Sequence, residues 1–282
     1  MFRNRIRRVY RTILPWIWAR RNYKFFLTGS LFELDRKTQA VFHATNILKR
    51  YIKPIQVRPP FGKRCLVVAP HSDDEAIGCG GSVLSHLSKN GDARIIIVQD
   101  GSGAEAAIGL SRKELIEIRE QESIECAKRL GIEAPRFLRY ARVGVDNVSR
   151  LAADLEGIIM EYQPDAVFGP FILDHNYEHE NVSLALALAL ERTGLDVEVY
   201  SYEVWGLCIP NVAVFIDEFI DAKCELIACF KSQTRCNDYA HAFKGLAMYN
   251  SLQFGAIDTK YVERFLALPG NEYVDFVKKV AG

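Results

Sequence analysis

From Arg64 onward, short apolar runs alternate with longer amphipathic segments, and this order allows only a few folds. Four runs have strand character: residues 64–69, 93–99, 136–140 and 165–169. Helical patterns follow them at residues 75–89, 111–131, 149–162 and 180–194. Runs of continuous apolar character indicate strands that are buried on both faces. The alternation therefore predicts an α/β fold with a mostly parallel sheet and helices on both faces.

The length and composition of the chain are compatible with one large α/β domain. It has 282 residues, of which 49% are hydrophobic and 25% charged, as expected for a soluble globular protein. A cluster that contains Pro59, Pro60 and Gly62 interrupts the pattern just before the first strong strand. We therefore expect a basic N-terminal segment at residues 1–60 and one large domain at residues 61–282.

The N-terminal segment is strongly basic, although the whole chain has a formal net charge of only +1, which argues against a general nucleic-acid binder. Residues 1–26 contain eight lysines and arginines, interleaved with aromatic residues, and no acidic residue. The apolar stretch at residues 13–19 is too short to span a membrane and lacks the features of a cleaved secretory signal. Three interpretations fit: the segment lies on an anionic membrane surface, it is a solvated arm, or it docks on a partner.

The cysteines predict a reducing environment. There are seven, without a C-x-x-C pair, and this odd number suits neither a zinc knuckle nor a disulfide framework. We therefore expect a cytoplasmic protein. The membrane interpretation of residues 1–26 adds peripheral association with the inner membrane face.

Polar loops follow three of the predicted strands at the point where each strand ends. They are residues 71–75, 100–103 and 170–179. Ligands of open α/β sheets bind outside the carboxyl ends of the strands, so we expect these loops to converge on one edge of the sheet.

The stretch APHSDDEAIGCGG at residues 69–81 follows the first of these strands. Ser72 and Glu75 fit the capping box S-x-x-E of a helix start, which is a purely structural role. That role does not account for His71. It also does not account for a second histidine-rich loop at the same edge of the sheet.

A metal site accounts for both histidine-containing loops. Catalytic zinc sites take three protein ligands and leave one position open, and His71, Asp74 and His179 would supply such a set. Asp73 is not needed as a ligand in this set. It could instead accept a proton from the water that the metal activates.

The glycines in the same stretch allow a competing interpretation. Gly78, Gly80 and Gly81 could form a dinucleotide-binding loop, with Asp100 in the place of the ribose-binding acid. However, the third glycine is not at the required spacing, and acidic residues stand where pyrophosphate would bind. We interpret these glycines instead as residues that allow a helix to pack closely over the site.

These residues resemble the signature of a known family. PHSDDEAIGCGG is similar to A-H-P-D-D-E-x-x-G-x-G-G of the PIG-L/LmbE zinc-dependent N-deacetylases, which remove acetyl groups from N-acetylglucosamine-type sugars. The resemblance extends from about residue 63 to residue 233. It implies a Rossmann-like fold, a metal ion bound by His71, Asp74 and His179, and Asp73 as the base.

The second histidine motif departs from the family pattern. Members commonly have H-P-D-H, with two histidines three apart, whereas His175 and His179 are four apart. The first histidine assists the oxyanion or the leaving group in some members, and His175 is the candidate for this role. Asn176 or Tyr177 could substitute for it, and both are candidates for substrate contact. Glu178 replaces the usual Asp and would orient a histidine ring.

Two further residues are candidates for binding substrate hydroxyls or an acidic group. They are Arg119 and Asp146. An ion pair between Arg119 and Glu122 along one helix is the simpler explanation of the arginine.

The expected function is that of a metal-dependent hydrolase that removes the acetyl group from an N-acetylated amino sugar. We expect Zn²⁺, although iron or cobalt would also suit two histidines and a carboxylate. A lipid-linked sugar or a surface-polysaccharide precursor fits the basic segment, and a small thiol-glycoside precursor is another candidate substrate. The alternatives are a non-catalytic sugar- or membrane-binding module on the same fold and a nucleotide-dependent oxidoreductase.

Overall fold

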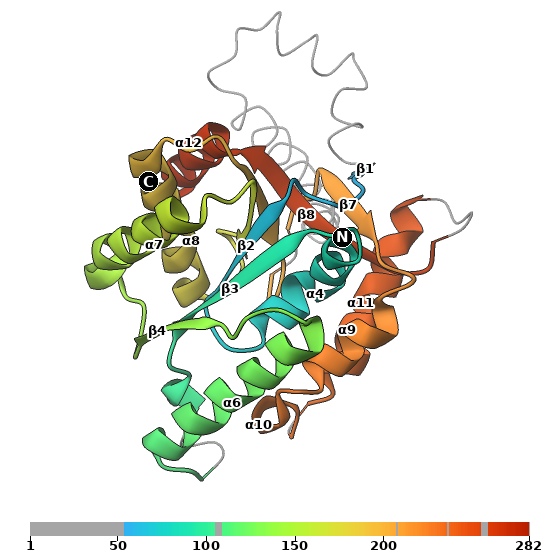
Figure 1. Cartoon of the computed structure of the whole chain (residues 1–282), viewed down its shortest axis with the longest axis horizontal. Helices are drawn as coiled ribbons and strands as arrows, with labels where there is room; N and C mark the ends of the chain where they lie inside the picture. Colours follow the sequence, from blue (N-terminus) through green and yellow to red (C-terminus); the bar gives the residue numbers. More distant parts are fainter. Residues whose placement is uncertain (1–53, 105–108, 207, 236, 255–258, 282) are drawn as a thin grey trace, which may run out of the picture. The chain divides into compact units, whose positions relative to one another are not determined.

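One eight-stranded sheet forms the centre of the part of the chain that the computed structural model describes, residues 54–104, 109–206, 208–235, 237–254 and 259–281 (Figure 1). The strands are β1 (Ile55–Gln56), β2 (Arg64–Ala69), β3 (Asp92–Gln99), β4 (Arg136–Tyr140), β5 (Ala166–Pro170), β6 (Glu198–Tyr202), β7 (Val212–Phe215) and β8 (Val262–Pro269). The basic segment expected at residues 1–60 lies mostly outside the described residues.

The helices carry the numbers that they have in Figure 1. They are α4 (Asp74–Leu87), α6 (Arg112–Leu130), α7 (Val148–Tyr162), α8 (Tyr177–Thr193), α9 (Ile220–Ile227), α10 (Lys231–Thr234), α11 (Tyr239–Ser251) and α12 (Gly270–Ala281). Short 3₁₀ helices lie at Ser102–Ala104, Val145–Asn147 and Leu252–Phe254. Among the described residues, no helix has the length and apolar character that a membrane span requires.

The sheet is parallel except at one strand. Its order is β1-β7-β8-β6-β5-β2-β3-β4, and only the two pairings made by β8 are antiparallel. β2 lies between β3 and β5, so the chain moves away from β2 in one direction and later returns on its other side. Such a reversal is the place where open α/β sheets bind ligands. The prediction of a mostly parallel α/β sheet is confirmed.

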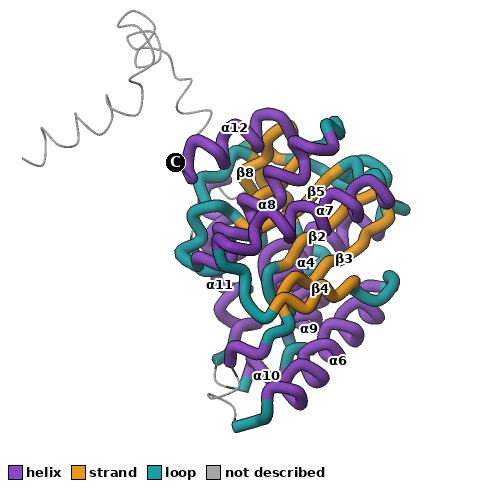
Figure 2. The backbone as a smooth tube through the Cα atoms, turned by 90° about the vertical axis from the view of Figure 1, so that its left-hand side faces the viewer, coloured by secondary structure: helices purple, strands orange, loops and turns teal. Residues whose placement is uncertain are grey.

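Alternate residues of β2 belong to two separate hydrophobic cores. Cys65, Val67 and Ala69 pack with residues of α4, α6, α9 and α11, whereas Leu66 and Val68 pack with residues of α7, α8 and α12. Figures 1 and 2 show these two groups of helices on opposite sides of the strands. Successive side chains of a strand point to opposite faces, so a strand covered on both faces is apolar throughout.

Most predicted element boundaries agree with the structure, but α8 starts earlier than its apolar pattern suggested. It begins at Tyr177 rather than at residue 180. Asn176 caps this helix, because its side chain accepts a hydrogen bond from the N–H of Glu178 at 2.9 Å. The first turn of α8 contains the acidic residues Glu178 and Glu180, which are favourable at a helix N-terminus but interrupt the apolar pattern. His179 therefore lies on a helix and not on the preceding loop.

The glycines of α4 are sites of close packing. A Cβ atom on Gly78 would lie 2.3 Å from the ring of Tyr202, and one on Gly81 would lie 2.9 Å from Ile216. The Tyr202 ring is held in place because its hydroxyl donates to the carbonyl oxygen of Val68 at 2.9 Å. The helix-packing interpretation thus holds for Gly78 and Gly81, whereas a Cβ atom on Gly80 would make only an ordinary contact, 3.5 Å from Leu226.

We predict opposite effects for two glycine-to-alanine changes in helices. Gly78→Ala should lower the free energy of unfolding by about 1–3 kcal/mol, the usual cost of overpacking a core. Gly157→Ala is the control, because a Cβ atom there would meet nothing within 4 Å. It should raise the free energy of unfolding by about 0.5–1 kcal/mol, the difference in helix propensity. Urea unfolding of both variants measures this, and equal effects would contradict the packing.

Candidate metal and active site

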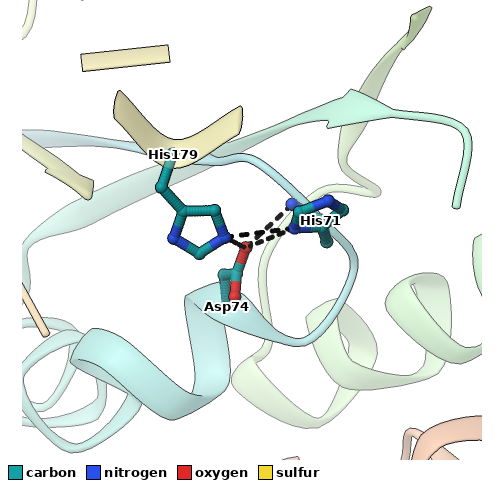
Figure 3. A group of neighbouring side chains, drawn as sticks. All are labelled: His71, Asp74 and His179. Atoms are coloured by element: carbon teal, nitrogen blue, oxygen red, sulfur yellow. Dashed lines mark hydrogen bonds and ion pairs between the residues drawn. The ribbon is translucent and has the colours of Figure 1, made fainter. Parts of the chain in front are cut away.

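Three side chains from different elements converge beyond the carboxyl ends of β2 and β5 (Figure 3). His71 follows β2, Asp74 is the first residue of α4, and His179 lies in the first turn of α8. The Nδ1 atom of His71 lies 3.3 Å from Oδ2 of Asp74 and 3.2 Å from Nε2 of His179. The third side of the triangle, from His179 Nε2 to Asp74 Oδ2, is 3.3 Å. The structure thus brings together the three residues that the sequence proposed as metal ligands.

The dimensions of this triangle fit a metal ion of the zinc type. Nitrogen and oxygen ligands bind zinc at 2.0–2.2 Å, and in a tetrahedral site such ligands lie about 3.3–3.5 Å from one another. Two imidazole nitrogens and one carboxylate oxygen are also a donor set that zinc prefers. The residues present therefore suit a divalent transition metal with one position left for another ligand.

The far nitrogen of each ring is held by a carboxylate. Nδ1 of His179 lies 2.7 Å from Oδ2 of Asp174, and Nε2 of His71 lies 3.1 Å from Oε2 of Glu178. Gln99 Nε2 is a second neighbour of His71 Nε2, at 3.0 Å. A carboxylate on the far nitrogen favours the tautomer that leaves the other nitrogen with a free lone pair. In the neutral form of each ring, this lone pair faces the centre of the triangle.

Asp174 is a site residue that the sequence analysis missed. It is fully buried, and besides His179 it binds a backbone loop. Its Oδ1 atom accepts hydrogen bonds from the N–H groups of Val204, Trp205 and Gly206 at 3.0, 3.0 and 2.7 Å. Nothing in the local pattern marks this residue, because its partners lie on α8 and on the loop after β6.

Asp73 has an unusual backbone conformation directly beside the triangle. It precedes α4 with a φ of 114°, and its side chain makes no capping hydrogen bond. Its N–H donates to Oε2 of Glu75 at 2.9 Å. The capping-box interpretation of Ser72 and Glu75 is therefore wrong, since Asp73 and not Ser72 occupies the N-cap position. Glu75 instead stabilises the turn by accepting a hydrogen bond from the N–H of Asp73, the residue with the strained backbone.

Arg119 binds the backbone of this turn. Its guanidinium donates to the carbonyl oxygen of Ser72 at 2.7 Å and lies 3.8 Å from Oδ1 of Asp73. The expected ion pair with Glu122 is not formed, because the Glu122 carboxylate accepts from the N–H and the hydroxyl of Ser232, both at 2.7 Å. Arg119 is buried and lines the same cavity as the triangle.

The pKa values of the two adjacent aspartates move in opposite directions. Burial raises the pKa of Asp73 to about 7, and the charge of Arg119 offsets only part of this effect. Burial acts on Asp74 in the same sense, but the charge and hydrogen bond of His179 outweigh it and hold the pKa of Asp74 well below its usual range. For His179, burial opposes the charged form, yet Asp74 and Asp174 raise its pKa to about 10. Neighbouring carboxyl groups with such different environments are typical of acid–base sites.

Two residues of the triangle, His71 and Asp74, line a cavity of about 480 Å³. Its lining includes side chains that are far apart in the sequence: His71, Asp73, Asp74, Gln99, Arg119, Arg142, Asn176, Tyr177, Glu178, Trp205, Gln233 and Tyr239. A larger hollow of about 650 Å³ lies between α6 and α9 and contains none of the predicted site residues. The cavity at the triangle is therefore the candidate active site.

Three residues proposed from the sequence are not part of this cavity lining. His179 is fully buried, whereas His175 and Asp146 are both exposed. The ring of His175 lies against the backbone of Gly206, because a Cβ atom on that glycine would be 2.6 Å from it. Asn176 and Tyr177, the other candidates in the same motif, do line the cavity.

Comparison with known proteins agrees with the resemblance seen in the sequence. Residues 66–190 match the family described as PIG-L, GlcNAc-PI de-N-acetylase. A diacetylchitobiose deacetylase of Thermococcus kodakarensis is 22% identical over 196 residues, which cover 63% of this chain and 73% of that protein. The resemblance to the PIG-L/LmbE-like deacetylases is thereby confirmed.

Solved structures share the fold at low sequence identity. The N,N′-diacetylchitobiose deacetylase of Pyrococcus horikoshii has a TM-score of 0.68 and 22% identity, over 85% of this chain and 96% of that one. GalB of Pseudomonas putida KT2440, a 4-carboxy-2-hydroxymuconate hydratase, has a TM-score of 0.59 and 22% identity, over 73% and 96%. At this identity the similarity establishes the fold alone, and the reaction has to be argued from the site.

We predict that Asp174→Asn weakens metal binding by roughly 10- to 100-fold, the usual effect of losing a carboxylate behind a histidine ligand. An amide nitrogen would donate to Nδ1 of His179, so the proton of the ring would move to Nε2 and block the lone pair that faces the triangle. Asp165→Asn is the control, since this carboxylate binds the N–H groups of Lys63 and Arg64 at the start of β2. Titration with Zn²⁺ or Co²⁺ measures both affinities. Unchanged affinity in Asp174→Asn would contradict the assigned tautomer.

Proposed function

We propose that this chain, whose residues 66–190 match the PIG-L de-N-acetylase family, is a metal-dependent hydrolase that removes the acetyl group from an N-acetylated amino sugar. One observation carries the proposal. Two members of the triangle, His71 and Asp74, line the same cavity as a carboxylate, Asp73, that is not part of the triangle. A metal site with an adjacent free carboxylate suits hydrolysis of an amide.

The proposed cofactor is Zn²⁺ or another divalent transition metal, held by His71, Asp74 and His179. Bound there, such an ion would supply a Lewis acid that polarises the amide carbonyl and lowers the pKa of a water molecule. Glu178 and Asp174 would keep the two rings in the ligating tautomer. The deep burial of Asp74 and His179 would keep competing water away from these ligands.

Asp73 is proposed as the general base and acid of the reaction. Its carboxylate would take a proton from the water that attacks the acetyl carbonyl, and would pass it to the amide nitrogen as the C–N bond breaks. The products are acetate and the free amine of the sugar. Arg119, anchored on the carbonyl of Ser72, would hold Asp73 in position for both transfers.

An N-acetylglucosamine-type sugar is the proposed substrate class. The description of the matching family and the name of the Thermococcus kodakarensis relative support it. Asn176 and Tyr177, on the wall formed by the start of α8, would contact the sugar hydroxyls. A lipid-linked sugar or surface-polysaccharide precursor is proposed because residues 1–26 are strongly basic.

We predict that changes at the two neighbouring aspartates have different effects. Asp74→Ala removes a ligand, so metal content and activity should fall together. Asp73→Asn leaves the ligands in place but cannot accept a proton, so metal should be retained while kcat falls by about 10²-fold or more, the scale of general-base catalysis. The KM for substrate should change little, since this interaction is made chiefly in the transition state.

Metal analysis, thermal unfolding and release of acetate from N-acetylglucosamine check this prediction on the same protein samples. A folded, metal-loaded wild-type chain that releases acetate from no N-acetyl sugar would favour the non-catalytic binding module. Loss of metal in Asp73→Asn with retention in Asp74→Ala would reverse the two roles.

We also propose that residues 1–26 bind an anionic membrane surface, at the cytoplasmic face. Replacing Arg3, Arg5, Arg7, Arg8 and Arg11 with Gln in the full chain should weaken binding to anionic liposomes at low salt by at least about tenfold. Each basic residue near such a surface contributes about 1 kcal/mol. Turnover of a soluble N-acetyl sugar should stay unchanged. Neutral liposomes are the control, and equal binding of both chains to anionic ones would refute the proposal.

A further inference from the structure

The rim of the active-site cavity carries aromatic surface that the proposed chemistry does not use. Trp205, on the loop after β6, is 56% exposed. Tyr239, the first residue of α11, lies next to it, with ring centroids 6.2 Å apart and planes at 78°. Both side chains line the same cavity as His71 and Asp74 of the triangle. An exposed tryptophan beside a polar site is a candidate for ligand contact.

The position of Trp205 is tied to the metal site. Its N–H donates to Oδ1 of Asp174 at 3.0 Å, and the other oxygen of the same carboxylate holds the ring of His179. The neighbours of Trp205, Val204 and Gly206, are buried and donate to the same Oδ1 atom. The backbone under the exposed indole is therefore fixed relative to the triangle. A fixed, exposed aromatic ring loses little conformational entropy when a ligand packs on it.

The chemistry of the rim indicates which part of a substrate would lie there. The amide to be cleaved must reach Asp73 and the triangle, so the rim receives atoms remote from that amide. A lipid chain would need a continuous apolar wall. However, the lining of this cavity also includes the polar side chains of Gln233 and Arg142. An aromatic face with polar groups around it suits a sugar ring, which has C–H groups on its faces and hydroxyls on its edge.

We propose that Trp205 and Tyr239 form a subsite for a second sugar ring, joined to the N-acetyl sugar at the metal site. The substrate is then a disaccharide or a longer glycan rather than a free monosaccharide. This inference rests on the proposed deacetylase function. Trp205 and Tyr239 are specificity-determining residues here and take no part in the bond-breaking step.

The first test compares two substrates, N-acetylglucosamine and its β-1,4-linked disaccharide, with metal-loaded full-length protein. In Trp205→Ala, kcat/KM for the disaccharide should fall by about tenfold or more, the scale of an aromatic contact in a binding site. The value for the monosaccharide should change less than about twofold. The loss should lie in KM, and Trp205→Phe should restore part of it. Tyr239→Leu, a second variant, should show the same selectivity to a smaller degree.

Ile209→Ala is the matched control, because Ile209 is 71% exposed, lies in the same loop region and does not line the cavity. It should leave both substrates unaffected. If Trp205→Ala lowers kcat/KM for the two sugars by the same factor, or lowers neither, the subsite is refuted while the deacetylase function stands.

The second test does not depend on turnover. The sequence has three tryptophans, so changing Trp16 and Trp18 to Phe leaves Trp205 as the sole indole fluorophore. With Asp73→Asn added to prevent hydrolysis, the disaccharide should shift the emission of Trp205 in a saturable way, and N-acetylglucosamine should not. A saturable shift with dodecyl micelles but none with the disaccharide would overturn the proposal in favour of a lipid. If the wild-type chain deacetylates neither sugar, the proposed function loses support, and this titration decides the subsite independently of it.

Discussion

The parallel pairing of β2 with β5 is the constraint on which the site depends. Because these strands run side by side in the same direction, the segments that follow them leave from one edge of the sheet. His71 and His179 are 108 residues apart in the chain, yet two of their ring nitrogens lie 3.2 Å apart. Neither segment would hold a metal alone. The sheet supplies the proximity, and the carboxylates of the buried Asp174 and the partly buried Glu178 supply the orientation.

Much of the fold and the convergence of His71, Asp74 and His179 could be predicted from the sequence, whereas the surroundings of these three residues could not. Strands β2 to β5 and the helices between them are regular enough for their periodicity to define them, and a strand end fixes where His71 and Asp74 lie. The three-residue capping pattern at Ser72 was misleading, because a local motif cannot reveal that the next residue adopts a left-handed backbone. Asp174 and Trp205 were missed for another reason: their partners are distant in sequence, and only the tertiary fold brings them together.

The last part of the chain escaped prediction and yet holds α4 in place. The buried Lys223 and Glu263 come from α9 and β8, with Nζ and Oε1 2.6 Å apart. Lys223 donates to the carbonyl oxygen of Ile77 at 2.7 Å, and Glu263 accepts from the N–H of Gly81 at 2.9 Å. These are the two groups that an α-helix would join. The ion pair between α9 and β8 thus fixes the middle of α4, the helix that begins with Asp74.

The left-handed backbone of Asp73 lowers the stability of the fold at a residue whose carboxylate lines the cavity. A non-glycine residue with a backbone φ of 114° carries a strain of about 1–3 kcal/mol, which a glycine would avoid. For folding alone, glycine would be the better residue at this position, but it has no carboxylate to offer the cavity. The turn at Asp73 separates two consecutive carboxyl groups. That of Asp74 belongs to the triangle, and that of Asp73 lines the cavity beside it. A substitution that relieves the strain at Asp73 would therefore raise thermal stability only by removing the carboxylate from the cavity.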